Sequence, residues 1–275
     1  MSTERQVAQH YSHSALEQTI FKALTAMGKD PDRLTHADLA AVDEFHIGGR
    51  QATIDFAAQF GARAGMHLID IGCGLGGASR HFAIEHGCRV TGIDLTDDYV
   101  RAATALSQRV GLGDRVLYRQ ASALALPFPG ASFDGAYMLH VGMNIADKAT
   151  LFAEVRRVLT PGGTFGIYDV MRESDAEFVY PVPWSAAPDT NFIAAAADYK
   201  RLLAAAGFAV TYERSRREFA LQFFQQLRAR MAQSGPSPLG LQILMGATTP
   251  QKVANMIGLI DRGVIAPTEI IATAG

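Results

Sequence analysis

Cysteine is scarce in this sequence, and its charge is nearly balanced. Cys73 and Cys88 are the only cysteines among 275 residues, which is too few for a disulfide framework. The formal net charge is −2 and lysine and arginine are scattered along the chain, so neither nucleic acid nor an anionic membrane surface is expected as a partner. No cysteine–histidine spacing typical of a metal site occurs, so no metal is expected.

Long hydrophobic runs are also missing. No apolar segment approaches the roughly 18 residues that a membrane-spanning helix needs, so no membrane span is expected. Residues 1–30 carry charges and lack the apolar centre of a secretory signal. Together with the two lone cysteines, these absences predict a soluble, cytoplasmic protein.

The sequence does contain enough apolar residues for a large core. Hydrophobic residues make up 48% and charged residues 19% of the chain, which argues against global disorder. The length suits one large domain, or one domain with a cap. Residues 1–62 are the expected helical cap. Apolar residues at helical spacing indicate a helix over 16–27, and Ser14 with Glu17 fits a capping box at its start.

Two further cap helices, at 34–42 and 51–60, flank a loop at 43–50. From residue 63 onwards, apolar strands alternate with helices. Strands are expected at 68–71, 89–93, 116–119, 133–139, 164–169, 208–212 and 264–273, and helices at 77–86, 96–110, 148–159 and 193–206, with Thr96 and Asp147 as N-caps. This alternation predicts parallel strands joined by right-handed crossovers. The main domain is therefore 63–275, with a lid-like helical insertion at about 216–262 before the last strand.

A glycine turn follows the first strand. Gly72, Gly74 and Gly77 fit the G-x-G-x-x-G pattern, and Asp94 lies 20 residues after Gly74, as in the dinucleotide-binding fingerprint. Asp70, two residues before the first glycine, changes this interpretation, because a carboxylate there would repel a pyrophosphate and suits a cation. Asp94, at the end of the second strand, is placed to bind a ribose diol.

Together with two later motifs, this turn resembles that of the class I S-adenosylmethionine-dependent methyltransferases, whose acid-x-Gly-x-Gly-x-Gly loop it matches through Gly76. Residues 126–134 match the segment that leads into the fourth strand, and Pro161-Gly162-Gly163 matches the turn before the fifth. The resemblance covers about residues 66–213 and takes in the last strand. It implies a Rossmann-like, seven-stranded α/β sheet of order 3-2-1-4-5-7-6 with the last strand antiparallel. It also implies S-adenosylmethionine as cofactor and S-adenosylhomocysteine as product.

The resemblance assigns the cofactor site to the ends of the first four strands and to the cap. The residues implied are Asp70, Gly72, Cys73, Gly74, Asp94, Leu95, Ser122, Ala123, Leu124, His140, Arg50 and Tyr11. One position departs from the family pattern. Ser122 stands where the family often carries the acid that holds the adenine amino group, and a hydroxyl binds an amine more weakly. Backbone groups of Ala123 and Leu124 are expected to compensate.

Within the family, the chain is similar to small-molecule enzymes that include the sarcosine/dimethylglycine N-methyltransferases and the quinone-biosynthesis C-methyltransferases. This narrower resemblance rests on the helical N-terminus and on segments 43–49 and 140–144. The acceptor pocket is expected at the carboxyl ends of the strands and in the cap. Its predicted residues are Phe45, His46, Met143, Asn144, Tyr168, Arg172 and Trp184. His46 and His140 are the candidate catalytic residues, although each is equally well explained as a structural histidine.

The leading hypothesis is methyl transfer to a small-molecule acceptor by in-line displacement, which depends mainly on positioning and water exclusion. An NAD-dependent dehydrogenase shares the glycine pattern but explains neither Asp70 nor the Pro-Gly-Gly turn. A non-catalytic S-adenosylmethionine-binding protein is a third alternative. Alanine, phenylalanine and methionine in the lid favour an apolar or aromatic acceptor, whereas Arg50 or Arg172 could meet a carboxylate. The acceptor, its methylated atom, the use of a general base and the oligomeric state, a homodimer included, stay open.

Overall fold

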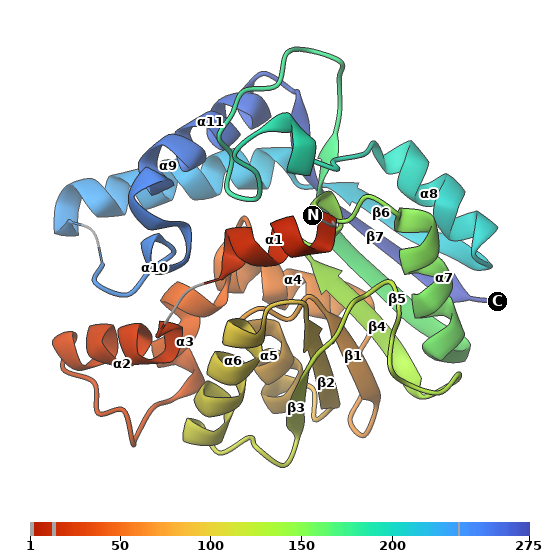
Figure 1. Ribbon diagram of the computed structural model, residues 1–275, viewed down its shortest axis with the longest axis horizontal. Coiled ribbons are helices and arrows are strands. Elements are labelled where there is room, and N and C mark those ends of the chain that lie inside the picture. The colour runs from red at the N-terminus through yellow and green to blue at the C-terminus, as the bar shows by residue number, and fades with distance from the viewer. Residues whose placement is uncertain (1–2, 13–14, 236) are drawn as a thin grey trace.

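A seven-stranded sheet runs through the middle of the computed structural model, which describes residues 3–12, 15–235 and 237–275 (Figure 1). The strands are β1 (His67–Ile71), β2 (Arg89–Asp94), β3 (Val116–Gln120), β4 (Phe133–Leu139), β5 (Leu159–Arg172), β6 (Phe208–Ser215) and β7 (Ile265–Ala274). Their order is β3-β2-β1-β4-β5-β7-β6. Only β7 runs antiparallel to its neighbours, β5 and β6. The predicted strand order and the antiparallel last strand are confirmed.

Helices cover both faces of the sheet and extend beyond one end of it. They are α1 (Thr3–Tyr11), α2 (Leu16–Ala26), α3 (His36–Asp43), α4 (Gly49–Phe60), α5 (Gly77–Glu85), α6 (Asp97–Arg109), α7 (Lys148–Val158), α8 (Ala196–Ala205), α9 (Arg217–Ser234), α10 (Gln242–Met245) and α11 (Thr249–Asp261). Short 3-10 turns occur at Gly142–Asn144, Pro188–Thr190 and Gly246–Thr248. Helices on both faces bury the central strands, which is why those strands have nearly continuous apolar sequences.

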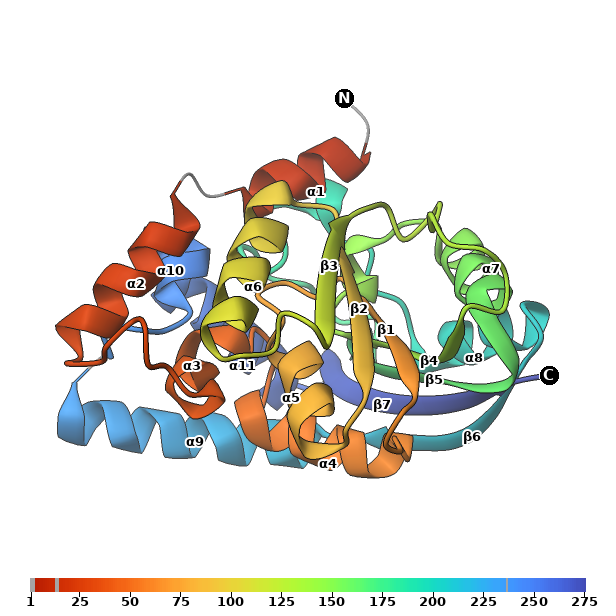
Figure 2. The same cartoon turned by 90° about the horizontal axis from the view of Figure 1, so that it is seen from below.

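Two apolar cores lie on opposite faces of the sheet (Figure 2). On one face, α4 and α5 contribute Phe56 and Phe82 to a core that also holds Tyr137 of β4. On the other face, α7 and α8 contribute Phe152 and Leu203. Burial of one large apolar side chain is worth about 1.5–3 kcal/mol, so these cores hold the helices firmly against the strands.

Helices α1–α3 and the helices inserted between β6 and β7 lie beyond the carboxyl ends of the parallel strands (Figure 1). They meet in a third core, in which Leu16 and Ile20 of α2 pack with Leu106 of α6 and with Leu239 and Leu244 next to and within α10. The end of the sheet at which ligands bind in open α/β folds is therefore roofed by two segments that are far apart in sequence.

Several local predictions need correction. Strand β5 begins at Leu159 and ends at Arg172, longer than the predicted 164–169, because it pairs with β4 and with nine residues of β7 in turn. Helix α1 was not predicted as a separate element, since no residue of it is buried. Thr96 holds the N-cap position of α6 but its side chain makes no capping hydrogen bond. The capping box predicted at Ser14 lies outside the described residues.

The N-cap prediction at Asp147 is confirmed. Its side chain accepts a hydrogen bond from the backbone N–H of Thr150 at 2.9 Å. The same carboxylate also accepts from the Thr150 hydroxyl at 2.7 Å. Helix α7, which carries the connection from β4 to β5, is therefore started by a fixed cap next to the ligand-binding end of the sheet.

Candidate active site

A large cavity opens between the carboxyl ends of the strands, the N-terminal helices and the helical insertion. Its volume is about 1450 Å³, whereas pockets for a single small molecule usually measure about 300–1,000 Å³. The cavity therefore has room for more than one ligand.

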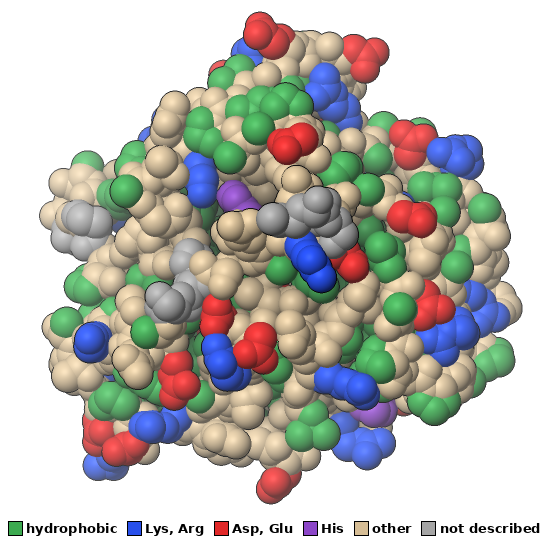
Figure 3. Space-filling view, in the orientation of Figure 1, with side chains coloured by type: hydrophobic (Ala, Val, Ile, Leu, Met, Phe, Trp, Pro, Cys, Tyr) green, Lys and Arg blue, Asp and Glu red, His purple; other side chains and the backbone are tan. Residues whose placement is uncertain are grey.

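Positive and negative side chains are mixed over the face of the molecule that carries α1 and α9–α11 (Figure 3).

The glycine loop after β1 forms one wall of this cavity. Gly72 has a φ of +69°, and a Cβ at this position would lie 2.6 Å from Cγ2 of Val141. Glycine is favoured at such a backbone angle, and any side chain here would clash with Val141. Helix α5 begins directly after the loop, at Gly77, so unpaired N–H groups of its first turn lie next to the loop.

Asp94 ends β2 beside the glycine loop. One carboxylate oxygen accepts a hydrogen bond from the Gly74 N–H at 3.0 Å, and the other accepts from the Thr96 N–H at 2.9 Å. Burial raises the pKa of this carboxyl despite those bonds. A carboxylate can accept about four hydrogen bonds. Asp94 therefore keeps acceptor capacity for a diol in the cavity, which it lines together with Leu95.

Asp70 lies deeper, within β1, and is 2% exposed. Its Oδ2 accepts a hydrogen bond from the Ser79 hydroxyl at 2.6 Å. Burial raises the pKa of Asp70 to about 7. A cation bound in the adjoining cavity would favour the ionised form of this carboxyl and would be favoured by it in return.

On the far side of the loop, Ala123 and Leu124 line the cavity but Ser122 does not. The Ser122 hydroxyl is turned towards α1, where it donates to the carboxylate of Glu4, and it accepts from the Leu124 N–H at 3.0 Å. The predicted contact of Ser122 with the cofactor stays a prediction, and in this structure its side chain is not part of the cavity wall. The reason is the N-terminal helix, whose place no sequence motif indicated.

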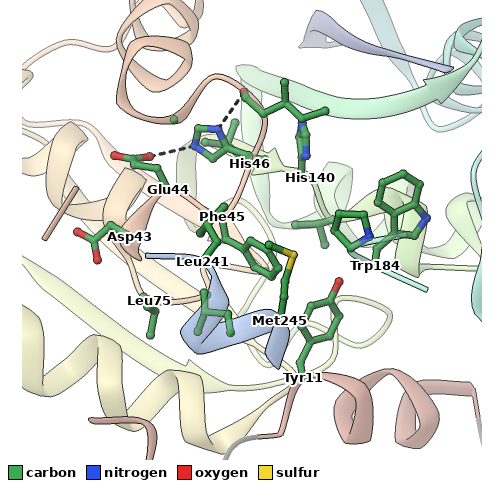
Figure 4. A pocket seen from close by; sticks show the side chains of 18 of the residues that line it. Tyr11, Asp43, Glu44, Phe45, His46, Leu75, His140, Trp184, Leu241 and Met245 are labelled. Atoms are coloured by element: carbon green, nitrogen blue, oxygen red, sulfur yellow. Dashed lines mark hydrogen bonds and ion pairs between the residues drawn. The ribbon is translucent and has the colours of Figure 1, made fainter. Parts of the chain in front are cut away.

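Glu44 organises the loop at 43–50. Its carboxylate accepts hydrogen bonds from Arg50 Nε at 2.9 Å and from the Thr53 hydroxyl at 2.7 Å, and His46 Nε2 lies 3.0 Å from it (Figure 4). Burial alone would raise the pKa of Glu44, but the contacts with His46, Thr53 and Arg50 outweigh it and lower the pKa to about 2. Both predicted cap residues, His46 and Arg50, line the cavity while held by this carboxylate.

His140 lies beside His46 of that loop, directly after β4 (Figure 4). Its φ is +57°, a left-handed conformation that is uncommon outside glycine. Its ring lies 5.9 Å from the ring of His46, and its Nε2 is buried with no hydrogen-bond partner among the described residues. Burial and the neighbouring His46 hold the pKa of His140 well below 6.5, so the cavity contains a neutral imidazole.

The remaining predicted pocket residues divide into two groups. Phe45, Met143, Asn144 and Trp184 line the cavity, as does Tyr11, whose hydroxyl donates to Asn144 Oδ1 at 3.3 Å. The Trp184 indole N–H donates to Asn191 Oδ1 at 2.9 Å, which fixes the ring at the cavity wall.

Tyr168 and Arg172 do not line the cavity, so their placement in the pocket is corrected. The Tyr168 side chain is fully buried in the core beneath α4, and its hydroxyl donates to the Ile47 carbonyl at 2.9 Å. The Arg172 guanidinium stacks over Phe178 at 5.6 Å and donates to the Ala176 carbonyl at 2.8 Å. Both residues lie within β5, and side chains alternate between the two faces of a strand, so a position on β5 does not by itself bring a side chain into the site.

Sequence reasoning missed much of the cavity wall. Residues of α1 and one face of α9 contribute to it, among them Thr3, Glu4, Val7, Phe219, Phe223 and Leu227. The four-residue spacing of the α9 side chains is a signal that could have identified that face.

Two absences concern other kinds of site. Within residues 3–12, 15–235 and 237–275, no group of three or more histidine, cysteine, aspartate or glutamate side chains could hold a metal ion. None of the helices in the described part of the chain is long and apolar enough to cross a membrane.

Comparisons with known sequences point to one activity class. Residues 69–167 match the family model described as a methyltransferase domain. Sterol 24-C-methyltransferase ERG6B of Gibberella zeae is 34% identical over 113 residues, which is 41% of this chain and 30% of that protein. O-methyltransferase resE of Aspergillus sclerotiorum is 32% identical over 133 residues, 48% of this chain and 50% of that protein. The matched regions thus span between about a third and a half of these relatives.

Solved structures share the fold over nearly the whole chain. Geranyl diphosphate C-methyltransferase from Streptomyces coelicolor has a TM-score of 0.73 at 18% identity, covering 100% of this chain and 99% of that one. The [4+2]-cyclase SpnF has a TM-score of 0.70 at 22% identity, covering 99% and 97%. None of these similarities supports a nicotinamide dehydrogenase. The chain therefore carries a methyltransferase domain, built on the seven-stranded fold of the class I S-adenosylmethionine-dependent methyltransferases.

Proposed function

We propose that this protein transfers a methyl group from S-adenosylmethionine to a small-molecule acceptor. The observation that carries the proposal is the placement of Asp70 and Asp94 on either side of a glycine loop, within the matched methyltransferase domain and beside a cavity large enough for two ligands. A buried carboxylate suits a cationic ligand, and a strand-end carboxylate suits a ribose diol.

Each residue of the cofactor wall has a role in this proposal. Asp94 accepts hydrogen bonds from the ribose hydroxyls, and the ionised form of Asp70 attracts the cationic methionine end. Arg50 keeps N–H donors beyond those bound to Glu44 and the His36 carbonyl, and these would meet the methionine carboxylate. Ala123 and Leu124 contact the adenine. The cofactor supplies a methyl group already activated by its sulfonium.

The acceptor is placed by the opposite wall, which includes Phe45, Met143, Asn144 and Trp184. Catalysis in this proposal comes from holding the acceptor in line with the methyl group and from excluding water. His140 presents a neutral imidazole to the acceptor and does not repel the cationic cofactor. His46, bound to Glu44, acts as a positioning residue of the loop.

The domain division follows from the same proposal. Residues 1–62 and the insertion at about 216–262 act as a cap and a lid over the methyltransferase domain, 63–275. The two buried cysteines, Cys73 and Cys88, are unpaired, which fits a reducing cytoplasm. The mixed surface charge supports a small molecule and not nucleic acid as partner.

Calorimetry and thermal unfolding with added ligands test the cofactor assignment. We expect S-adenosylhomocysteine to bind and to raise the Tm, because a ligand that binds only the folded state stabilises it. NAD is the control and should leave the Tm unchanged. Stabilisation by NAD without stabilisation by S-adenosylhomocysteine would overturn the proposal.

A transfer screen tests the reaction itself. S-adenosylmethionine with an isotope-labelled methyl group is incubated with the protein and with panels of amines, phenols, quinols and apolar alkenes. Labelled product that is lost in the Asp94→Ala variant supports the proposal. Tight S-adenosylhomocysteine binding without transfer to any panel would assign a non-catalytic binding protein.

A further inference from the structure

The cavity extends well beyond the glycine loop, into the helical insertion. The insertion's wall residues are mostly apolar, and come from α9, α10, α11 and the connections between them. They are Phe219, Gln222, Phe223, Phe224, Gln226, Leu227, Arg230, Met231, Gly235, Ser237, Leu239, Gly240, Leu241, Gln242, Leu244, Met245, Thr249, Pro250, Val253 and Met256. None of these residues is among those assigned above to the cofactor.

The α9 contribution is a single helical face. Phe219, Phe223, Leu227 and Met231 follow one another at intervals of four residues, and Arg230 lies on the same face. Residues three and four apart share one side of a helix. At 1.5 Å per residue, the face from Phe219 to Arg230 is about 16 Å long. The wall is therefore an elongated strip.

One end of the strip lies at the loop at 43–50. The ring of Phe219 occupies the space that a Cβ on Gly48 would need, and a Cβ on Gly49 would lie 3.9 Å from Phe223. His46 precedes these two glycines and lies 5.9 Å, ring to ring, from His140. The apolar strip thus begins at Gly48 and Gly49, two and three residues after His46.

The other end of the strip carries a positive charge. Helix α9 projects past the edge of the sheet (Figure 2), and Arg230 lies in its last turns. Among the wall residues that the insertion contributes in the described part of the chain, Arg230 is the only charged one. No hydrogen bond or ion pair joins it to another described residue. Its guanidinium therefore has donors available for an oxyanion at the far end of the strip.

The facing wall is also apolar and adaptable. Leu241 and Met245 project into the cavity beside Phe45 and Tyr11 (Figure 4). Met256 of α11 lines the same chamber. Methionine side chains fill irregular space around apolar ligands, so the two walls together suit a long apolar body.

We infer that this chamber binds the methyl acceptor as an elongated molecule, apolar over most of its length and ending in an oxyanion that Arg230 holds. The methyl-accepting end lies beside His46 and His140. The oxyanion is a carboxylate or a phosphate, both of which match the planar fork of arginine. That the ligand is the methyl acceptor rests on the proposed function. The chemical class of the ligand rests on the residues of the chamber alone.

The single tryptophan provides a direct test. Trp184 lines the cavity and is the only tryptophan in the chain, so its fluorescence reports on ligands in the chamber. The probes are dodecanoate, dodecyl phosphate, dodecan-1-ol and hexanoate, each below its micelle concentration. We expect one of the two C12 anions to bind about tenfold more tightly than dodecan-1-ol. Hexanoate should bind more than about 100-fold more weakly than dodecanoate, since each buried methylene is worth about fourfold in affinity.

Arg230→Gln is the decisive variant. It should remove the preference for the C12 anions over dodecan-1-ol and leave dodecan-1-ol binding unchanged. Arg228→Gln is the matched control, because Arg228 is on the same exposed helix but does not line the cavity. Equal affinities for anions and alcohol in the unchanged protein, or an anion preference that survives in Arg230→Gln, would overturn the inference. The anion that binds more tightly identifies the oxyanion.

Calorimetry with S-adenosylhomocysteine on the same preparations separates the two proposals. Arg230-dependent binding of a C12 anion without S-adenosylhomocysteine binding would reject the proposed function and keep the chamber's chemistry. S-adenosylhomocysteine binding with no binding of any C12 probe would reject the inference and keep the proposed function.

Discussion

The two walls of the cavity are built from different kinds of chemical group. The cofactor wall consists of backbone groups and carboxylates at strand ends, with Asp94 fixed by two backbone N–H donors. The proposed acceptor wall consists mostly of apolar side chains, many of them on the helices of the insertion, with one arginine at its far end. A wall made of backbone geometry accepts one ligand shape, whereas a wall of helical side chains can be altered residue by residue. The predictions below address whether the walls act separately.

The largest effect is expected where the cap joins the domain. Asp43, at the end of α3, accepts a hydrogen bond from Arg80 of α5 at 2.6 Å, and both side chains are fully buried. Asp43→Ala would leave the Arg80 charge buried without its partner, and we expect a loss of about 3–5 kcal/mol in the free energy of unfolding. Urea denaturation measures it. Asp43→Asn, which keeps a hydrogen-bond acceptor, should lose less, and a change below about 1 kcal/mol in Asp43→Ala would contradict the role of this pair.

The second effect concerns the cofactor wall alone. Asp94→Ala should weaken S-adenosylhomocysteine binding about 100-fold, because charge-assisted hydrogen bonds to the ribose are lost. Calorimetry measures the Kd. The exposed Asp97, three residues further along and paired with Arg101, provides the control variant Asp97→Ala. Dodecanoate binding should not change in either variant, and an equal loss for both ligands in Asp94→Ala would show that the walls are not separable.

The third effect is a pH dependence of cofactor binding. In the free protein the pKa of Asp70 is raised by burial to about 7, and a cationic ligand favours the ionised form. Below pH 7 a proton must therefore be released on binding, so we expect the Kd for S-adenosylmethionine to be about tenfold higher at pH 6 than at pH 8. Asp70→Asn should show a flat profile over this range. Binding that strengthens towards pH 6 would contradict a cation-facing role for Asp70.

The same shift has a consequence for the protein without ligand. Because the fold raises the pKa of Asp70 from 3.8 to about 7, the folded state binds more protons than the unfolded state between these values. The contribution of this carboxyl to stability is therefore present below pH 3.8 and is lost as pH rises through 7.

The smallest effect is expected at the contact between α1 and the domain. Tyr11→Phe removes the hydrogen bond to Asn144, which is long at 3.3 Å, and should weaken S-adenosylhomocysteine binding about threefold. A double-mutant cycle with Asn144→Ala provides the control, since the two losses should not add if the bond is what matters. Additive losses would show that each side chain acts alone.

The glycine-loop wall of the cavity, to which we assign the cofactor, was largely predictable from the sequence. Four positions could be recognised in the sequence because few other residues satisfy the backbone angles and the burial required. They are Gly72, Gly74, Asp70 and Asp94. The strand order came from the resemblance that these motifs support, and the structure confirms it.

The acceptor wall was not predictable to the same degree. The Ser122 side chain points towards Glu4, the Tyr168 side chain lies in the core, and the Arg172 guanidinium lies over the Phe178 ring. These directions depend on neighbours distant in sequence. Phenylalanine and methionine in the insertion indicated an apolar chamber, but the face of α9 that forms it depends on where α9 packs against the loop at 43–50.

The position of the insertion in the chain has a consequence for how such a protein can change. The helices α9–α11 leave the sheet after β6 and return through β7, its hydrogen-bonded neighbour. A connection between adjacent antiparallel strands can be lengthened, shortened or exchanged without shifting the register of the strands that carry Asp70 and Asp94. The proposed acceptor chamber is in this sense a replaceable module, and grafting another connection between Ser215 and Ile265 would show whether the substrate range changes with it.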